Sequence, residues 1–315
     1  MSLPKSFIAG GLATWLMILS PAVASGLKSG DILVADRTYG LIVVDPVDGS
    51  QSYLTGFFNG HGFADVVTNE AGKIYALDSQ GVIVAVDAAT GAVTPISSGG
   101  YLTSSNCMDL SPDGSLIAQA GAPSYGLVKV DPGSGSQTLI APGLPVDALA
   151  VIDAGTAYVM SYPSGSTTQW YAYHLNFATG DTLRVSNVSF FNPRALAIES
   201  ASSFIAVEAY GIVSRVFPAL GSVAPIASGP PFQGLTGVAV EPGGRILVAD
   251  PQGNPSCNPP GPASTCRGAV YAVSGAPTVV SEQGKFDIIA GLAVYVGPST
   301  PTRASTWGRV KVLYR

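Results

Sequence analysis

The sequence predicts an all-β protein: a six-bladed β-propeller of four-stranded antiparallel blades, closed by its C-terminal strand. Three observations predict this fold class. They are the composition, a repeat that returns every 41–47 residues, and a constant order of strands and turns within each repeat.

The composition favours a turn-rich β protein. The 315 residues include 38 Gly and 24 Pro, and both residue types oppose helix interiors. A hydrophobic fraction of 47% and a mean hydropathy of +0.36 argue against intrinsic disorder. The glycines show no period of three, which excludes a collagen helix.

The repeat is clearest in two segments that lie far apart. GDILVAD at 30–36 matches GRILVAD at 244–250 in six of seven positions, and GKIYALD at 72–78 is a third copy. Weaker copies occur between these segments, and the repeats begin at residues 30, 72, 114, 155, 202 and 244. This spacing is typical of propeller blades, which hold four strands each.

The other parts of each repeat predict the remaining three strands. A small apolar strand precedes each copy, as in GVAV at 237–240, and another apolar strand follows it, as in LIVV at 41–44. Asp or Asn then begins a tight turn that ends in Gly, as in DPVDG at 45–49. A short fourth strand, such as QTLI at 137–140, completes the blade.

The two ends of the repeat array predict how the ring closes. The first copy has no inner strand before it, whereas GLAVYV at 291–296 supplies an additional one late in the chain. We expect this late strand to complete the first blade, which leaves no open sheet edge at the seam.

The N-terminus predicts export. Lys5, the apolar run at 7–19, Pro21 and AVA at 22–24 match a secretory signal cleaved after Ala24. An uncleaved membrane anchor is the alternative, although the run is shorter than the roughly 20 apolar residues of a spanning helix. The predicted organisation is a signal peptide at 1–24, a propeller at 25–298 and a basic tail at 299–315. We expect a secreted, periplasmic or cell-envelope protein with no transmembrane span after signal removal.

The three cysteines fit an exported protein. Cys257 and Cys266 flank NPPGPAST, and a disulfide between them would close and stiffen a small loop. Cys107 lies in an apolar stretch and is predicted to be a buried free thiol.

The strand motif G-x-I-[LY]-[VA]-[AL]-D and the turn motif V-D-P-x-[DTS]-G resemble those of NHL-repeat and SMP-30/gluconolactonase-like six-bladed propellers. The resemblance covers residues 28–297. It implies a closed ring that acts either as a binding scaffold or as a metal-dependent lactonase-type enzyme. The early Glu-Gly-Pro segment of those lactonases has no counterpart in this chain.

One face of the propeller, which we call the loop face, is predicted to hold the functional residues. It is formed by loops from each fourth strand to the next blade and by loops between second and third strands. These loops contain many aromatic residues, which either bind a ligand or fill gaps between blades. The predicted ligand or partner residues are Phe57, Phe58, His61, Tyr101, Asn106, Tyr125, Phe190, Phe191, Arg194, Tyr210 and Phe232. Arg37 and Arg267 lie in the same loops and could read an anionic group together with Arg194.

Repeated carboxylates are weak candidates for a metal site. Asp36, Asp78, Glu208 and Asp250 share one repeat position, while Asp65 and Asp109 lie on inner strands. A ring of carboxylates at the mouth of the pore could hold Ca²⁺, because Ca²⁺ prefers oxygen ligands. The alternative is that each carboxylate caps a turn within its own blade. No other cofactor is required by the sequence.

The chain has only two histidines, which limits the catalytic and metal-binding sites that it could form. His61 precedes an inner strand and is a weak candidate for a general base or a metal ligand, or it holds loop backbone. His174 lies in an outer strand and is predicted to be structural. The sequence has no G-x-S-x-G elbow, no P-loop and no dinucleotide fingerprint after a strand.

Charge separates the tail from the body. The net charge is −5, yet the tail holds four basic residues and no acidic ones. The acidic body makes nucleic acid an unexpected partner. The tail could fold back onto that body, dock another protein, or lack fixed structure.

Three functional classes follow. The leading one is an exported scaffold that binds a protein or small-molecule ligand on its loop face. The alternative is a metal-dependent hydrolase or lyase of the lactonase type, with His61, Asn106, Asp36 and Asp250 near the pore mouth. The third is a cell-surface structural module that docks through its tail.

Overall fold

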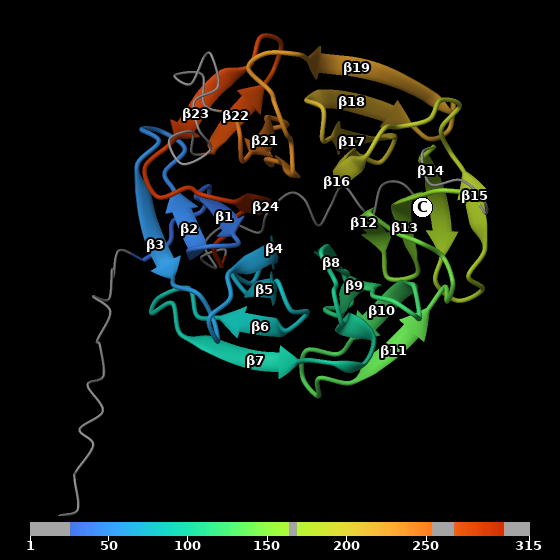
Figure 1. Cartoon of the computed structure of the whole chain (residues 1–315), viewed down its shortest axis with the longest axis horizontal. Helices are drawn as coiled ribbons and strands as arrows, with labels where there is room; N and C mark the ends of the chain where they lie inside the picture. The colour runs from blue at the N-terminus through green and yellow to red at the C-terminus, as the bar shows by residue number, and fades with distance from the viewer. Residues whose placement is uncertain (1–25, 164–168, 254–267, 299–315) are drawn as a thin grey trace, which may run out of the picture.

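The computed structural model describes residues 26–163, 169–253 and 268–298. Within these ranges, twenty-four strands form six four-stranded sheets that stand as blades around a central channel (Figure 1). All neighbouring strands within a blade run antiparallel, so the predicted fold class is confirmed.

The strands of each blade follow one another from the channel outward. Blade 1 consists of β24 (Ile289–Val294), β1 (Ile32–Asp36), β2 (Gly40–Val44) and β3 (Gln51–Thr55). Blade 2 consists of β4 (Phe63–Thr68), β5 (Ile74–Asp78), β6 (Ile83–Val86) and β7 (Val93–Ser97). Blade 3 consists of β8 (Met108–Leu110), β9 (Leu116–Ala120), β10 (Gly126–Val130) and β11 (Gln137–Ile140), and a short 3-10 helix, η1 (Gly100–Leu102), precedes it.

The second half of the ring repeats this order. Blade 4 consists of β12 (Ala148–Asp153), β13 (Thr156–Ser161), β14 (Tyr171–Asn176) and β15 (Thr182–Arg184). Blade 5 consists of β16 (Pro193–Ser200), β17 (Ser203–Glu208), β18 (Ile212–Phe217) and β19 (Ser222–Ser228). Blade 6 consists of β20 (Gly237–Val240), β21 (Ile246–Asp250), β22 (Ala269–Val273) and β23 (Thr278–Glu282).

The ring closes as the sequence predicts. Strand β24 pairs antiparallel with β1, with Leu292 opposite Val34 and Val294 opposite Ile32. The backbone of Tyr295 extends this pairing, because its N–H donates to the carbonyl of Asp31 and its carbonyl accepts from Gly30. The last strand of the propeller is therefore the inner strand of the first blade.

The repeat strands form the buried layer of the blades. Every residue of β1 and β21 is buried, because each second strand is covered on both faces by neighbouring blades. This position explains the continuous apolar run of the repeat motif, since a strand buried on both faces need not alternate. By contrast, all three residues of the outer strand β15 are exposed.

The hydrophobic core is divided among the junctions between blades. At the seam, Leu247 and Val270 from blade 6 pack with Val34 and Ile42 from blade 1. Five further clusters of buried side chains lie in the described part of the ring. Each blade is thus stabilised by its neighbours, and the core depends on an unbroken ring.

The Asp-to-Gly turns have the predicted conformation. The carboxylate of Asp45 accepts the N–H of Val47 at 2.8 Å, and Gly49 adopts a left-handed φ of 71°. A side chain at Gly49 would also collide with the backbone carbonyl of Val280 in blade 6. This glycine therefore permits both the turn and the close approach of two blades.

The structure bears on only some of the other sequence predictions. Cys107 is buried and has no disulfide partner, which confirms the predicted free thiol. The predicted signal peptide, the Cys257–Cys266 disulfide and the basic tail lie outside the described residues. In the described ranges, no helix is both long and apolar enough to cross a membrane.

We expect removal of β24 to destroy the fold rather than weaken it locally. A chain ending at residue 288 loses the partner of β1 together with the contacts that β24 makes with β4 and β20. It should show no cooperative thermal unfolding transition by circular dichroism. A chain ending at residue 298 keeps the seam and should unfold cooperatively. Similar melting temperatures for the two chains would contradict this role of β24.

Candidate functional site: the loop face and the central channel

The two faces of the ring are built from different connections. The loop face carries the connections between blades and those between second and third strands. The opposite face, which we call the turn face, carries the tight turns between first and second strands and between third and fourth strands. The two faces therefore present different residue types to solvent.

Exposed aromatic side chains gather in loops of the loop face. Phe57 is 64% exposed and Tyr210 is 62% exposed, whereas the core aromatics are almost fully buried. The rings of Phe191 and Tyr210 lie 5.1 Å apart, so these two residues form a contiguous aromatic pair. The exposed aromatics in these loops are Phe57, Tyr101, Tyr125, Phe191 and Tyr210.

Three of the other predicted face residues pack inward. Phe190 is 3% exposed and packs with Leu196 and Phe204, so it belongs to the core and not to the binding face. Phe232 is 5% exposed and meets Tyr271 edge to face. Phe58 is partly buried against the cluster between blades 1 and 2. The inclusion of Phe190 and Phe232 in the binding surface was wrong, because these rings fill gaps between blades.

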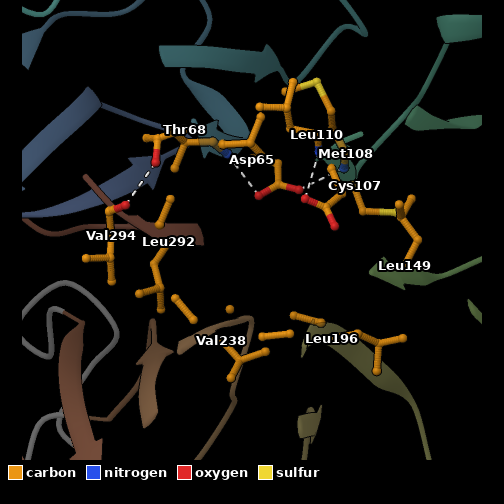
Figure 2. Close-up of a pocket in the computed structure, with 18 of the residues that line it drawn as sticks. Asp65, Thr68, Cys107, Met108, Leu110, Leu149, Leu196, Val238, Leu292 and Val294 are labelled. Atoms are coloured by element: carbon orange, nitrogen blue, oxygen red, sulfur yellow. Dashed lines mark hydrogen bonds between the residues drawn. The ribbon is translucent and has the colours of Figure 1, made fainter. Parts of the chain in front are cut away.

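The central channel forms a cavity of about 600 Å³. All six inner strands contribute to its wall, and apolar side chains surround the opening in Figure 2. These side chains include Met108, Leu149, Leu196, Val238 and Leu292. A cavity of this size lies within the range of small-molecule sites.

Small residues allow the inner strands to approach each other on one side of the channel. A β-carbon at Gly237 would lie 3.2 Å from the α-carbon of Gly291, which is tighter than ordinary packing. A β-carbon at Gly291 would collide with the carboxylate of Asp65. Glycine at both positions therefore brings blades 6, 1 and 2 together at the channel.

Two carboxylates interrupt the apolar wall. Asp65 on β4 accepts the N–H of Val66 at 2.9 Å and the N–H of Met108 at 2.8 Å (Figure 2). Asp109 on β8 accepts the N–H groups of Leu110 and Val151, both at 2.7 Å. Each carboxylate thus connects its own inner strand to the inner strand of the next blade.

The channel makes these two carboxylates hard to ionise. The pKa of Asp65 is raised to about 7, chiefly by burial and to a smaller extent by the nearby charge of Asp109, against the opposing effect of the backbone hydrogen bonds. Burial likewise raises the pKa of Asp109 to about 6. None of the ion pairs in the described residues includes either group. The charged state of both residues therefore costs free energy near neutral pH.

The loop-face mouth of the channel carries charges of both signs. Arg37 donates to the side-chain oxygen of Asn106 at 3.2 Å, and Arg194 lines the cavity. Desolvation and the nearby charge of Arg194 lower the pKa of Arg37. Burial raises the pKa of Asp147 to about 6, although Arg194 opposes this shift. The mouth can therefore interact with a polar group of either sign.

The repeated carboxylates hold loops of the loop face. Asp36 accepts N–H groups from Thr38 and Tyr39 in its own blade and from Asp287 in the loop that enters that blade. Asp250 repeats this arrangement with Gln252, Gln233 and Gly234. Glu208 accepts the N–H of Phe191, and Asp78 accepts those of Gln80 and Val82. Burial raises the pKa of Asp36 and of Glu208.

The contacts of Asp36, Asp78 and Asp250 agree with the turn-capping interpretation, whereas Glu208 holds the loop that enters its blade. In the described ranges, no group of three or more His, Cys, Asp or Glu side chains lies close enough to share a metal ion. The expected Ca²⁺ site remains a prediction without a set of gathered ligands among these residues.

The predicted catalytic candidate His61 is exposed, and its backbone forms two hydrogen bonds with Phe58, at 2.7 and 2.9 Å. Asn106, the other polar candidate, contacts Arg37. His174 lies on β14 and meets Tyr158 edge to face, in keeping with a structural role. Sequence reasoning did not single out Asp147, and it gave Asp65 and Asp109 no role in joining blades. The sequence signal that could have identified these three residues is a carboxylate next to or within a small apolar inner strand.

Comparison with known proteins supports the fold but identifies neither a family nor a function. No protein-family model matches the chain, and no curated protein matches its sequence. One similar solved structure is that of a nidogen/laminin complex, with a TM-score of 0.62 and 13% identity over 85% of this chain and 99% of that chain. A protein of unknown function from Bacteroides caccae has a TM-score of 0.61 and 11% identity, over 84% and 98% of the two chains.

A virginiamycin B lyase from Staphylococcus aureus is less similar, with a TM-score of 0.49 and 11% identity over 72% of each chain. The chain has a β-propeller fold. Identities this low show the fold alone, and the NHL or SMP-30 relationship is not shown by them.

We expect the channel carboxylates to make the protein less stable as the pH rises. A raised folded-state pKa adds stability below the unfolded value near 3.8, and this stability is lost as the pH passes the folded values near 6 and 7. Between pH 5 and 8, the free energy of unfolding of the unmodified protein should fall by about 2–4 kcal/mol more than that of a D65N/D109N variant. Urea unfolding at both pH values measures this difference.

The slope with pH is the readout, because asparagine also loses one of the two backbone contacts and lowers stability at every pH. Asp131→Asn is a matched control, since this carboxylate is exposed on a turn and hydrogen bonds lower its pKa. It should leave the slope between pH 5 and 8 unchanged. Equal slopes for the unmodified protein and D65N/D109N would show that the channel carboxylates are not desolvated as described.

Proposed function

We propose that this protein is an exported, NHL-like propeller that binds a partner protein on its loop face. The observation that carries this proposal is the set of five exposed aromatic side chains in the loops of that face. Export is supported by the signal-like segment at 1–24 and by the predicted Cys257–Cys266 disulfide. The partner protein would accordingly be bound outside the cytoplasm.

Exposed aromatics are costly unless they bind something. Tyr and Phe are enriched in protein interfaces, where burying each ring removes a large apolar area from water. Among the described residues, Phe191 and Tyr210 are the clearest pair, because their rings are in contact while both remain more than half exposed. We regard this pair as the centre of the binding surface.

The positions of the aromatics favour a broad partner over a small ligand. They come from loops of separate blades, with Phe57 between β3 and β4, Tyr101 between β7 and β8, and Phe191 between β15 and β16. A surface that extends around the ring fits another protein better than a compact molecule. The similar structure of a nidogen/laminin complex is itself that of a protein complex, which supports protein docking by this fold.

Rigid loops would strengthen such binding. Glu208 accepts the N–H of Phe191, so a buried carboxylate at the end of β17 fixes the backbone that carries an exposed ring. Asp36 and Asp250 hold other loops of the same face in the same way. Preorganised loops lose less conformational entropy when a partner binds.

Photo-crosslinking can identify the partner and test the face together. A photoreactive amino acid at position 191 should crosslink to one dominant protein in the native extracellular or envelope fraction. The same amino acid at position 220 should not, because Leu220 is more exposed than Phe191, at 77% against 55%, but lies on the turn face.

The affinity of the identified partner then tests the role of the aromatics. The double variant F191S/Y210S should weaken binding roughly tenfold or more, as expected for interface hot spots. Leu220→Ser is the matched control and should bind with unchanged affinity. Equal losses for both variants, or crosslinking only from position 220, would overturn the proposal.

A further inference from the structure

The turn face holds the point at which the described chain leaves the propeller. After β24, residues 295–298 run beside the turn at Gly72, where a β-carbon would lie 2.7 Å from Cδ of Pro298. Val296 and Gly297 line the central cavity, together with Glu70 and Pro242 from turns of blades 2 and 6. The described chain therefore ends, at residue 298, beside the turn-face mouth of the channel.

The turn face is strongly acidic. Some of its carboxylates are paired, as Glu199 is with Arg215 and Glu241 is with Arg245. Others are exposed and accept hydrogen bonds within their own turns, which lower their pKa and keep them ionised. This second group includes Asp48, Asp87 and Asp131.

The channel behind this mouth is apolar. Its turn-face half is lined by Val151, Ile198, Val240 and Val294 from four different blades. The whole cavity has a volume of about 600 Å³, which is sufficient for one large aromatic side chain. An apolar opening on a face with acidic turns farther out fits a segment that is both basic and aromatic.

Residues 299–315 have this chemistry. The segment carries Arg303, Arg309, Lys311 and Arg315, and it has no acidic residue. Trp307 and Val310 supply apolar side chains between the charges. The nine residues from Pro298 to Trp307 can span up to about 30 Å, so Trp307 can reach any part of the mouth.

We propose that residues 299–315 cover the turn face of their own propeller, with the basic side chains on its acidic turns and Trp307 in the turn-face mouth of the channel. Because the segment is tethered at that mouth, its effective concentration there is high. This proposal does not depend on the partner protein of the loop face.

Trp307 reports its own environment. In a chain of residues 25–315 carrying Trp170→Phe, Trp307 is the sole tryptophan. Its emission should lie to the blue of the free peptide 299–315, and acrylamide should quench it several-fold less. Replacing the four basic residues by Ser, or raising the salt to about 1 M, should restore much of the quenching. Emission and quenching equal to those of the free peptide would overturn the proposal.

A second experiment distinguishes docking in the same molecule from other occupants. The synthetic peptide 299–315 should bind the chain 25–298 saturably, and Ala239→Phe, which narrows the cavity, should weaken this binding at least tenfold. Circular dichroism would verify that the variant folds. If the variant is unfolded, a peptide 299–315 carrying Trp307→Ala replaces it, and this peptide should bind the chain 25–298 at least tenfold more weakly than the unchanged peptide. Protection of Trp307 that increases with protein concentration would assign the tail to a second copy instead.

Discussion

The structure depends on one backbone pairing, that of β24 with β1. These strands come from opposite ends of the described chain, yet they form the seam of blade 1. Every core cluster in the described residues lies between two neighbouring blades. The junctions on both sides of blade 1 therefore depend on the seam. The seam also places residue 298 at the turn-face mouth of the channel, where the basic segment begins.

Buried carboxylates provide a second set of constraints on the backbone. They occur on the loop face and in the channel wall, and the free-energy cost of ionising them differs between these two places. On the loop face, Asp36 and Asp250 each accept three backbone N–H groups and fix the backbone of the loops around them. In the channel wall, Asp65 and Asp109 join inner strands of blades 2, 3 and 4, while their raised pKa values reflect unfavourable burial of charge. The remaining blades have small residues such as Ala195 and Gly237 in this part of the wall.

The sequence predicted the ring well because the propeller repeats one local pattern. The apolar run of each repeat strand and the Asp-to-Gly turns are short-range signals, and the late GLAVYV segment was sufficient to predict closure. The loops lack such a period. Phe190 and Phe191 are neighbours, yet Phe190 is 3% exposed and Phe191 is 55% exposed. Which of the two faces solvent depends on blade packing, which no local pattern encodes. The roles of Asp65 and Asp109 depend likewise on the spacing between blades.

The loop face and the turn face of one rigid ring can therefore bind different partners, provided that the pairing of β24 with β1 stays intact. Hydrogen exchange of the folded protein measures this most directly, because amides of β1 and β24 report on opening of the ring. We expect the seam amides of Leu33 and Ala293, which lie opposite each other in the hydrogen-bonded positions of β1 and β24, to exchange only through global unfolding, as slowly as those in the centre of β17 or β21. Exchange at the seam that is orders of magnitude faster than in β17 would contradict it, since the ring would then open without unfolding.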